Sequence, residues 1–295
     1  MKKLMVSLLF VVPLLAYGSD PVVFTQPSGR GTANDLWAEM TRIGLESKGL
    51  RHRYEVGTCA SSLDAWNSAG KQTPIVMLYS SNWARTALQT GQPCLLKDNE
   101  QLTVYAAVRT PWWMCRNKTK SRPFDAKEVL LGYHGPSTPG EDIVADINAT
   151  NGYRWRGVDT KGSGANLMLL TNGEIDYGFI ASNFARRKIV EAPNSALECV
   201  ASWKKGDSIP YFKDLVKMKG DPTNLLYYTQ IIVGKNLTAE QDRLIREIYN
   251  VKTNAKFQEW IQDMSNGDYE VPKDSKKFME DFTNNVKQVM NVYKK

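Results

Sequence analysis

Histidine and cysteine are scarce in this chain, which narrows the chemistry that it can perform. The 295 residues include 2 histidines, His52 and His134, and 4 cysteines. The cysteines show neither the C-x-x-C spacing nor the Cys/His combinations that are typical of zinc sites. We therefore expect no bound metal and no cofactor.

Catalytic signatures are also missing. The sequence has no Gly-x-Ser-x-Gly nucleophile elbow, no His-Glu-x-x-His motif and no lysine in a phosphate-binding loop. Neither histidine has a nucleophile nearby in a known pattern, and the aspartates show no evident pairing. The sequence therefore predicts no catalytic residues, and we expect that the protein is not an enzyme.

Long apolar runs are absent except at the start of the chain. Two lysines precede a nearly apolar run from Leu4 to Leu15, and the small residues Ala16 and Gly18 stand at positions −3 and −1 of a cleavage site. This order predicts a cleaved signal peptide over residues 1–18. The alternative is an uncleaved membrane anchor, but the run is shorter than the roughly 20 residues that a bilayer span needs. We therefore expect an exported protein.

The excess of positive charge is small. Lys+Arg 38 against Asp+Glu 31 gives a formal net charge of +7, and removal of Lys2 and Lys3 with the signal peptide leaves 36 − 31 = +5. A modest excess that is spread along the chain does not predict binding to nucleic acid. It is compatible with a small anionic ligand.

Export changes what the four cysteines indicate, because disulfides persist in oxidising compartments. Four cysteines can form two disulfides in three different connectivities, and the sequence does not choose among them. The cysteines in question are Cys59, Cys94, Cys115 and Cys199.

The mature chain alternates between strand-like and helix-like segments. Strands are expected over residues 21–25, 53–56, 74–79, 102–109, 129–133, 153–158, 175–180 and 225–233. Helices are expected over residues 34–48, 63–69, 141–148, 165–171, 238–250, 254–264 and 275–293. Such alternation predicts an α/β fold with a parallel sheet and helices on its faces.

Glycine, serine and threonine gather in turns that follow the expected strands. The four turns are Pro27 to Thr32, Ser80 to Asn82, Gly135 to Thr138 and Gly162 to Ala165. Ligands of open α/β sheets bind at the carboxyl ends of strands. There the N-terminus of the next helix offers unpaired N–H groups and partial positive charge. Turns that converge from two lobes would form an anion-binding cleft, although Gly-rich turns are also common in α/β proteins of other functions.

Some side chains admit two interpretations. Arg30 either pairs with a ligand carboxylate or is a solvated loop residue. The pair Trp112-Trp113 either packs in a core, which we favour, or lines a cleft. Residues 153–156 alternate as Tyr-Arg-Trp-Arg, so that either the aromatic or the basic pair faces inward. The basic run at residues 186–188 is interpreted as a solvated helix face.

Several motifs together resemble the substrate-binding proteins of tripartite tricarboxylate transporters, the TctC or Bug family. Val22 to Thr32 is similar to the strand, Gly-rich turn and helix that open the mature domain of that family, with Arg30 where the family usually has glycine. Gly132 to Thr138 and Asp159 to Asn166 are similar to its later ligand-facing turns. The most specific match is Leu170 to Phe179, which resembles the family's Leu-x-Gly-Gly-x-Val-Asp strand.

The resemblance implies a two-lobed periplasmic-binding-protein fold. In this fold, each lobe is a mostly parallel sheet flanked by helices, and the ligand cleft lies between the lobes. Residues 19–104 and 226–295 would form lobe I, and residues 105–225 would form lobe II. The ligand-binding residues that it implies are Ser28, Gly29, Arg30, Gly31, Thr32, Ser81, Ser137, Thr138, Ser163, Gly164, Ala165 and Asn183.

The same resemblance implies a function. The protein would be a periplasmic monomer that captures a small organic anion, a carboxylate, and delivers it to membrane permease subunits. Two alternatives remain at this point. One is a binding protein or sensor for an amino acid or a phosphorus oxyanion, and the other is an exported enzyme.

Overall fold

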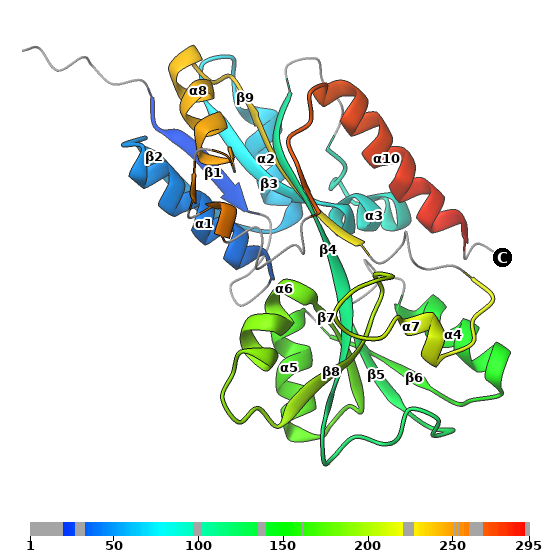
Figure 1. Ribbon diagram of the computed structural model, residues 1–295. Coiled ribbons are helices and arrows are strands. Elements are labelled where there is room, and N and C mark those ends of the chain that lie inside the picture. Colours follow the sequence, from blue (N-terminus) through cyan, green and yellow to red (C-terminus); the bar gives the residue numbers. More distant parts are fainter. Residues whose placement is uncertain are drawn as a thin grey trace, which may run out of the picture.

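The structure is a computed structural model in which the two halves of the chain share one long strand (Figure 1). It describes residues 20–26, 33–96, 102–134, 140–160, 162–220, 227–250, 252, 254–255, 257–259 and 268–292. The expected signal peptide, residues 1–18, lies outside the described residues. No helix in the described part of the chain is both long enough and apolar enough to cross a membrane.

The first half of the fold is a sheet with helices on both faces. Its strands are β1 (Val22–Gln26), β2 (His52–Val56), β3 (Ile75–Ser80), β9 (Tyr227–Lys235) and the first part of β4 (Thr103–Asn117). Strands β2, β1 and β3 are parallel to one another, β9 is antiparallel to β3, and β4 is antiparallel to β9. The short β10 (Tyr269–Glu270) also pairs with β4.

Alternating apolar residues explain why this sheet is covered on both faces. Val76 and Leu78 of β3 belong to one hydrophobic cluster, whereas Met77 and Tyr79 belong to another. Successive side chains of a strand point to opposite faces, so one strand can supply both cores. One face is covered by α1 (Ala33–Ser47) and α8 (Ala239–Ile248). The other is covered by α2 (Cys59–Ser68), α3 (Ser81–Thr90) and α10 (Ser275–Val292).

The second half contains a smaller sheet. The strands β5 (Leu130–Tyr133), β6 (Arg156–Asp159) and β7 (Tyr177–Ala181) are parallel, and β7 and β8 (Leu197–Ser202) are antiparallel to β4. The helices are α4 (Gly140–Asn151), α5 (Ser163–Asn172), α6 (Ser182–Ala185) and α7 (Phe212–Leu215). A π-helical turn, η2 (Arg186–Val190), follows α6 directly.

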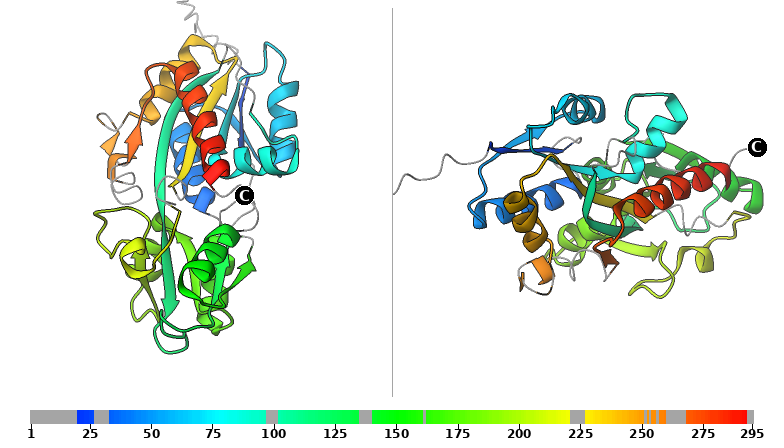
Figure 2. Two further views of the ribbon diagram at one scale, coloured as in Figure 1. Left: turned by 90° about the vertical axis from the view of Figure 1, so that its right-hand side faces the viewer. Right: turned by 90° about the horizontal axis from the view of Figure 1, so that it is seen from above.

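Strand β4 connects the two halves and determines how they are placed. Its residues up to Pro111 pair with β9, and those from Trp112 onward pair with β7 and β8. Figure 2 shows this strand running through both halves of the molecule. The sequence predicted a strand only as far as Arg109. Beyond Pro111 the strand continues with Trp112 and Trp113, aromatic residues that favour an extended chain.

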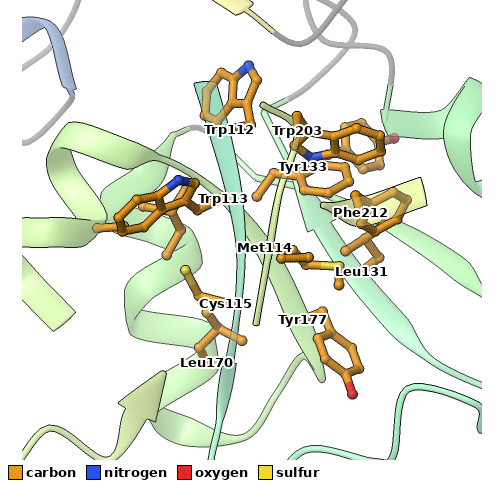
Figure 3. Packing of buried hydrophobic residues seen from close by; sticks show 14 of the residues in the cluster. Trp112, Trp113, Met114, Cys115, Leu131, Tyr133, Leu170, Tyr177, Trp203 and Phe212 are labelled. Carbon is orange, nitrogen blue, oxygen red and sulfur yellow. The ribbon is translucent and has the colours of Figure 1, made fainter. Parts of the chain in front are cut away.

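The tryptophan pair on β4 packs in the core of the second half, as favoured from the sequence. Trp112 and Trp113 are 3% and 2% exposed. Figure 3 shows Trp113 and Met114 on opposite sides of β4, with Leu131 and Tyr177 on the side of Met114. The structure also shows which residues of the alternating segment 153–156 face inward. Trp155 is buried, whereas Arg154 and Arg156 are exposed.

The structure selects one of the three possible disulfide connectivities. Cys59 is bonded to Cys94, and Cys115 is bonded to Cys199. The first bond ties α2 to the segment after α3, and the second joins the neighbouring strands β4 and β8. Each half of the fold therefore carries its own disulfide.

Two local expectations were wrong. Ser80 to Asn82 is not a turn, because β3 ends at Ser80 and α3 begins at Ser81. Helix α2 begins at Cys59, earlier than expected, because the side chain of Thr58 accepts a hydrogen bond from the N–H of Ser61 and caps it. Thr238 and Gln241 form a capping box at the start of α8.

Candidate functional site

The carboxyl ends of the parallel strands in the two halves face each other. Strand β3 is antiparallel to β9, and β9 is antiparallel to β4, so β3 runs in the direction of β4, toward the second half. Strand β7 is antiparallel to β4, and β5 and β6 are parallel to β7, so these three strands run toward the first half. Both sets of strand ends therefore lie where the two halves meet.

The register along β4 gives the separation of the two edges. Ser80, the last residue of β3, pairs with Gln230, which pairs with Val108 of β4. Ala181, the last residue of β7, pairs with Trp112 of β4. Four residues of an extended strand cover about 13 Å.

Buried polar side chains gather at the edge that the first half contributes. Gln26, Asn34, Ser80 and Gln230 are each no more than 4% exposed. The Nε2 of Gln230 donates to Oδ1 of Asn34 at 2.5 Å, which holds the start of α1 against β9. Buried amides are costly unless they are hydrogen-bonded, so this edge is built from fixed polar groups.

The start of α3 is attached to the same edge. The N–H of Thr229 on β9 donates to Oγ of Ser81 at 3.1 Å. Ser81, a residue predicted for ligand binding, is therefore the first residue of a helix and lies beside the end of β3. A helix N-terminus at this place offers backbone N–H donors.

Two buried hydroxyls at this level lack a hydrogen-bond partner among the described residues. They are Oγ of Ser80 and Oγ1 of Thr110, and both residues are fully buried. Thr110 lies on β4 between Val108 and Trp112, and thus between the levels of the two edges. Buried polar atoms without partners are rare, and they commonly mark a place that water or a ligand occupies.

The second half supplies a matching edge at the start of α5. Ser163 is buried, and its Oγ accepts a hydrogen bond from the N–H of Ala181 at 3.3 Å. Nδ2 of Asn166 donates to the carbonyl of Phe179 at 2.7 Å, while its Oδ1 has no partner among the described residues. Gly162 precedes the helix with φ 143°, a conformation that favours glycine.

His134 follows β5 directly and is an uncharged member of this edge. Its Nε2 lies 3.0 Å from the carbonyl of Phe179, so this nitrogen carries the proton. Its ring meets that of Trp112 edge to face at 4.4 Å. Burial lowers the pKa of His134 to about 4. At neutral pH this histidine therefore adds a polar group but no positive charge.

Arg85 of α3 is a buried cation that the sequence did not suggest. It is 5% exposed, and its Nη2 donates to Oδ2 of Asp142, in the first turn of α4, at 3.4 Å. Burial raises the pKa of Asp142, and the nearby Arg85 lowers it in part. No local pattern marks Arg85, because its partner Asp142 lies 57 residues further along the chain.

The predicted ligand-binding residues fall into two groups. Residues 28–32 and 137–138, which include Arg30, lie outside the described residues. The structure brings together the starts of two helices and the end of β7 at the facing edges. The predicted residues there are Ser81 on α3, Ser163, Gly164 and Ala165 on α5, and Asn183 on α6.

A cavity of about 400 Å³ lies away from these edges. It is lined in part by Arg116, Phe124 and Tyr177, and Tyr177 is the first residue of β7. The cavity therefore adjoins the amino end of that strand, opposite to the edge where α/β sheets bind ligands. Within the described part of the chain, no group of three or more His, Cys, Asp or Glu residues is arranged to hold a metal ion.

Solved structures match the chain over nearly its whole length. MatC from Rhodopseudomonas palustris with bound malate is 13% identical, with a TM-score of 0.62, over 93% of this chain and 99% of that chain. The fold is that of the periplasmic binding proteins. No family model matches the chain, and no curated protein matches it.

Two further structures with the periplasmic-binding-protein fold are similar. The periplasmic binding protein BugD is 11% identical, with a TM-score of 0.64, over 92% of this chain and 96% of that chain. The R. palustris protein Rpa4515 with adipate is 13% identical, with a TM-score of 0.63, over 92% and 95%. The expected fold class is thereby confirmed.

Proposed function

We propose that this protein is an exported solute-binding protein that captures a small carboxylate between two lobes and delivers it to the subunits of a membrane permease. The observation that carries the proposal is the pair of facing strand edges, about 13 Å apart along β4. These edges contain buried polar side chains and the N-termini of α3 and α5. Malate and adipate, which are bound in two proteins of the same fold, are small dicarboxylates.

Export to the periplasm is part of this proposal. The two disulfides support it, because structural disulfides persist in oxidising compartments and are rare in the cytoplasm. The expected signal peptide at residues 1–18 agrees with the same destination. We propose that the mature protein acts as a monomer of the TctC or Bug type.

The lobes expected from the sequence are residues 19–104 with 226–295, and residues 105–225. Since β4 pairs with β9 as far as Pro111, we propose that residues 105–111 also belong to lobe I and that the hinge lies at Pro111 and Trp112. Ligand binding would favour the closed arrangement, in which both edges contact the same molecule.

The proposed contacts are mainly N–H groups and hydroxyls. Ser81, Ser163, Gly164 and Ala165 lie in the first turns of α3 and α5, where unpaired N–H donors and the helix dipole favour an anion. The same role is proposed for Asn183 and for the turns at residues 28–32 and 137–138. Arg30 would add a charged, bidentate contact to a carboxylate.

A ligand panel tests the proposal. Thermal unfolding of the mature protein is measured with mono-, di- and tricarboxylates, with amino acids, and with phosphate and phosphonates. Stabilisation by one class of carboxylate is expected, with the ligand recovered unaltered by mass spectrometry. Stabilisation only by amino acids or phosphorus oxyanions, or conversion of the ligand, would contradict the proposal.

The contribution of Arg30 is tested separately by titration calorimetry with the best carboxylate from the panel. Arg30→Ala is expected to weaken binding more than about tenfold, or 1.4 kcal/mol, because it removes a charge-assisted contact. Arg51→Ala, at an exposed position, is the control. An unchanged affinity in Arg30→Ala would remove this residue from the proposed site.

A further inference from the structure

The cavity at the amino end of β7 has no part in the proposed carboxylate cleft. Its volume of about 400 Å³ is within the range of roughly 300–1,000 Å³ that is usual for small-molecule sites. It lies in the second half, between the sheet and the ends of α4 and α7. Ligands of α/β sheets bind at the opposite strand ends, so the cleft does not account for this cavity.

Aromatic rings that pack against one another line part of the cavity. The rings of Tyr153, Trp155 and Tyr177 stack in this order, with centroids 5.9 Å and 6.3 Å apart and interplanar angles of 11° and 6°. Phe124 lies nearly perpendicular to Tyr177, at 5.3 Å. The middle ring is anchored, because Nε1 of Trp155 donates to the carbonyl of Ala126 at 3.0 Å. The lining is therefore ordered before a ligand arrives, which lowers the entropic cost of binding.

Part of this apolar surface is open to solvent. Phe124 and Tyr153 are only partly buried, and Leu215, which also lines the cavity, is 44% exposed. In Figure 3 the hydroxyl of Tyr177 points away from the other labelled side chains of the core. A flat aromatic group in the cavity would cover this surface and meet the rings edge to face or offset-stacked, as aromatic pairs prefer.

The cavity also contains a basic side chain that the sheet holds in place. Arg116 of β4 pairs with Tyr177 of β7 and Glu198 of β8, and paired residues point to the same face of a sheet. Nε of Arg116 donates to Oε1 of Glu198 at 2.8 Å, and Nη2 lies 2.8 Å from the same oxygen. A guanidinium has five N–H donors. Its contacts with Glu198 and Tyr177 therefore leave donors for the carboxylate of a ligand.

An acidic side chain lines the same cavity. Asp125 is exposed, and its carboxylate is near enough to Tyr177 to act on the pKa of that residue. Burial raises the pKa of Tyr177, Arg116 lowers it in part, and the carboxylates of Asp176 and Asp125 raise it further. Opposite charges therefore lie around one ring of the lining. Because Glu198 already accompanies Arg116, a ligand with a carboxylate alone would meet more negative than positive charge among these side chains.

We propose that this cavity is a second binding site, separate from the carboxylate cleft, and that its ligand is a free amino acid with an aromatic side chain. The aromatic group lies against Phe124, Tyr153 and Tyr177. The α-carboxylate accepts from Arg116, and the α-ammonium donates to Asp125. The inference goes beyond the proposed function and does not depend on it, because none of these residues belongs to the facing strand edges.

Titration calorimetry of the mature protein tests the ligand class. The probes are L-phenylalanine, L-tyrosine and L-tryptophan, and each of three comparison compounds lacks one feature. L-Leucine lacks the aromatic ring, 3-phenylpropionate lacks the ammonium group, and 2-phenylethylamine lacks the carboxylate. At least one aromatic amino acid is expected to bind about tenfold more tightly than all three. No binding of the aromatic amino acids up to millimolar concentration, or equal binding of a comparison compound, would overturn the proposal.

Two variants locate the site. Arg116→Lys keeps the charge but loses the planar fork, and it is expected to weaken binding of the aromatic amino acid about tenfold. Asp125→Asn, at an exposed position where misfolding is not expected, should weaken it about threefold. The matched controls are Arg109→Lys, whose arginine lies on the same strand and pairs with Glu270, and Asp281→Asn, at an exposed position of α10. Both controls should bind as the parent protein does.

Simultaneous binding separates the cavity from the cleft. A carboxylate found in the ligand panel should still bind when the aromatic amino acid is saturating. Mutual exclusion of the two ligands would place the amino acid in the cleft and overturn the proposal, as would an affinity that neither Arg116→Lys nor Asp125→Asn changes. If no carboxylate binds, the proposed function fails on that point, while these two variants still decide on the second site.

Discussion

Single polar residues at the facing edges differ in how their hydrogen bonds are completed. Nε2 of Gln230 and Nδ2 of Asn166 donate to partners within the protein, whereas the hydroxyls of Ser80 and Thr110 have no partner among the described residues. A hydroxyl without a partner contributes little to folding. We expect such a group to contribute to binding instead, because a ligand or an ordered water can complete its hydrogen bonds.

Thr110 gives a direct test of this distinction. Thr110→Val is expected to change the free energy of unfolding by less than about 0.5 kcal/mol, and to raise the Kd of a carboxylate ligand about three- to tenfold. Urea denaturation and calorimetry measure the two effects. In the control Thr41→Val the removed hydroxyl has partners, since it donates to the carbonyl of Trp37 and accepts from Tyr249. The control should lose about 1–2 kcal/mol of stability and keep its affinity.

His134 gives the second prediction at this scale. Because its pKa is lowered to about 4 from the ordinary value of 6.5, the unfolded chain binds a proton between these pH values that the folded protein does not. Its contribution to stability is therefore complete above pH 6.5 and is lost as the pH falls toward 4. The residue is partly exposed, so we expect a loss of about 1–2 kcal/mol. In His134→Gln the pH dependence of the free energy of unfolding should be weaker than in the parent protein.

At the scale of elements, β4 is the part of the fold on which the others depend. It carries residues of both cores, pairs with strands of both halves and holds one cysteine of a disulfide. Helix α3 begins directly after β3, and α5 begins at Ser163, shortly after β6 ends at Asp159, and this places their N-termini at the two facing edges. The position of the site therefore depends on where the strands end, because each strand fixes the start of the helix that follows it.

The disulfides give a prediction for these elements. Cys59 and Cys94 are 35 residues apart, and Cys115 and Cys199 are 84 residues apart. In the chain-entropy account, replacing both cysteines of a pair by alanine should cost about 4 kcal/mol for the first and about 5 kcal/mol for the second. Urea denaturation of each double variant measures the loss. A non-reducing peptide map that links Cys59 to Cys115 or Cys199 would contradict the connectivity.

At the scale of the whole molecule, strand β4 joins two halves that are each stabilised internally. Each half has its own hydrophobic clusters and its own disulfide, so changes of shape should concentrate at β4 and β9. A carboxylate ligand at 100 times its Kd is expected to stabilise the protein by about 2.7 kcal/mol and to reduce its radius of gyration. Small-angle scattering and far-ultraviolet circular dichroism check this prediction. A ligand that binds with no change in radius, or that alters the secondary structure, would contradict closure by rigid halves.

The sequence by itself determined the alternation of strands and helices and the core position of Trp112 and Trp113. These features follow from local pattern, because apolar periodicity and turn residues act over a few positions. Only the tertiary structure decided the disulfide pairing, the continuation of β4 beyond Arg109 and the burial of Arg85 opposite Asp142. Each of these depends on groups that lie far apart in the chain and meet only after the strands have paired, and no local pattern records which distant partner a residue will meet.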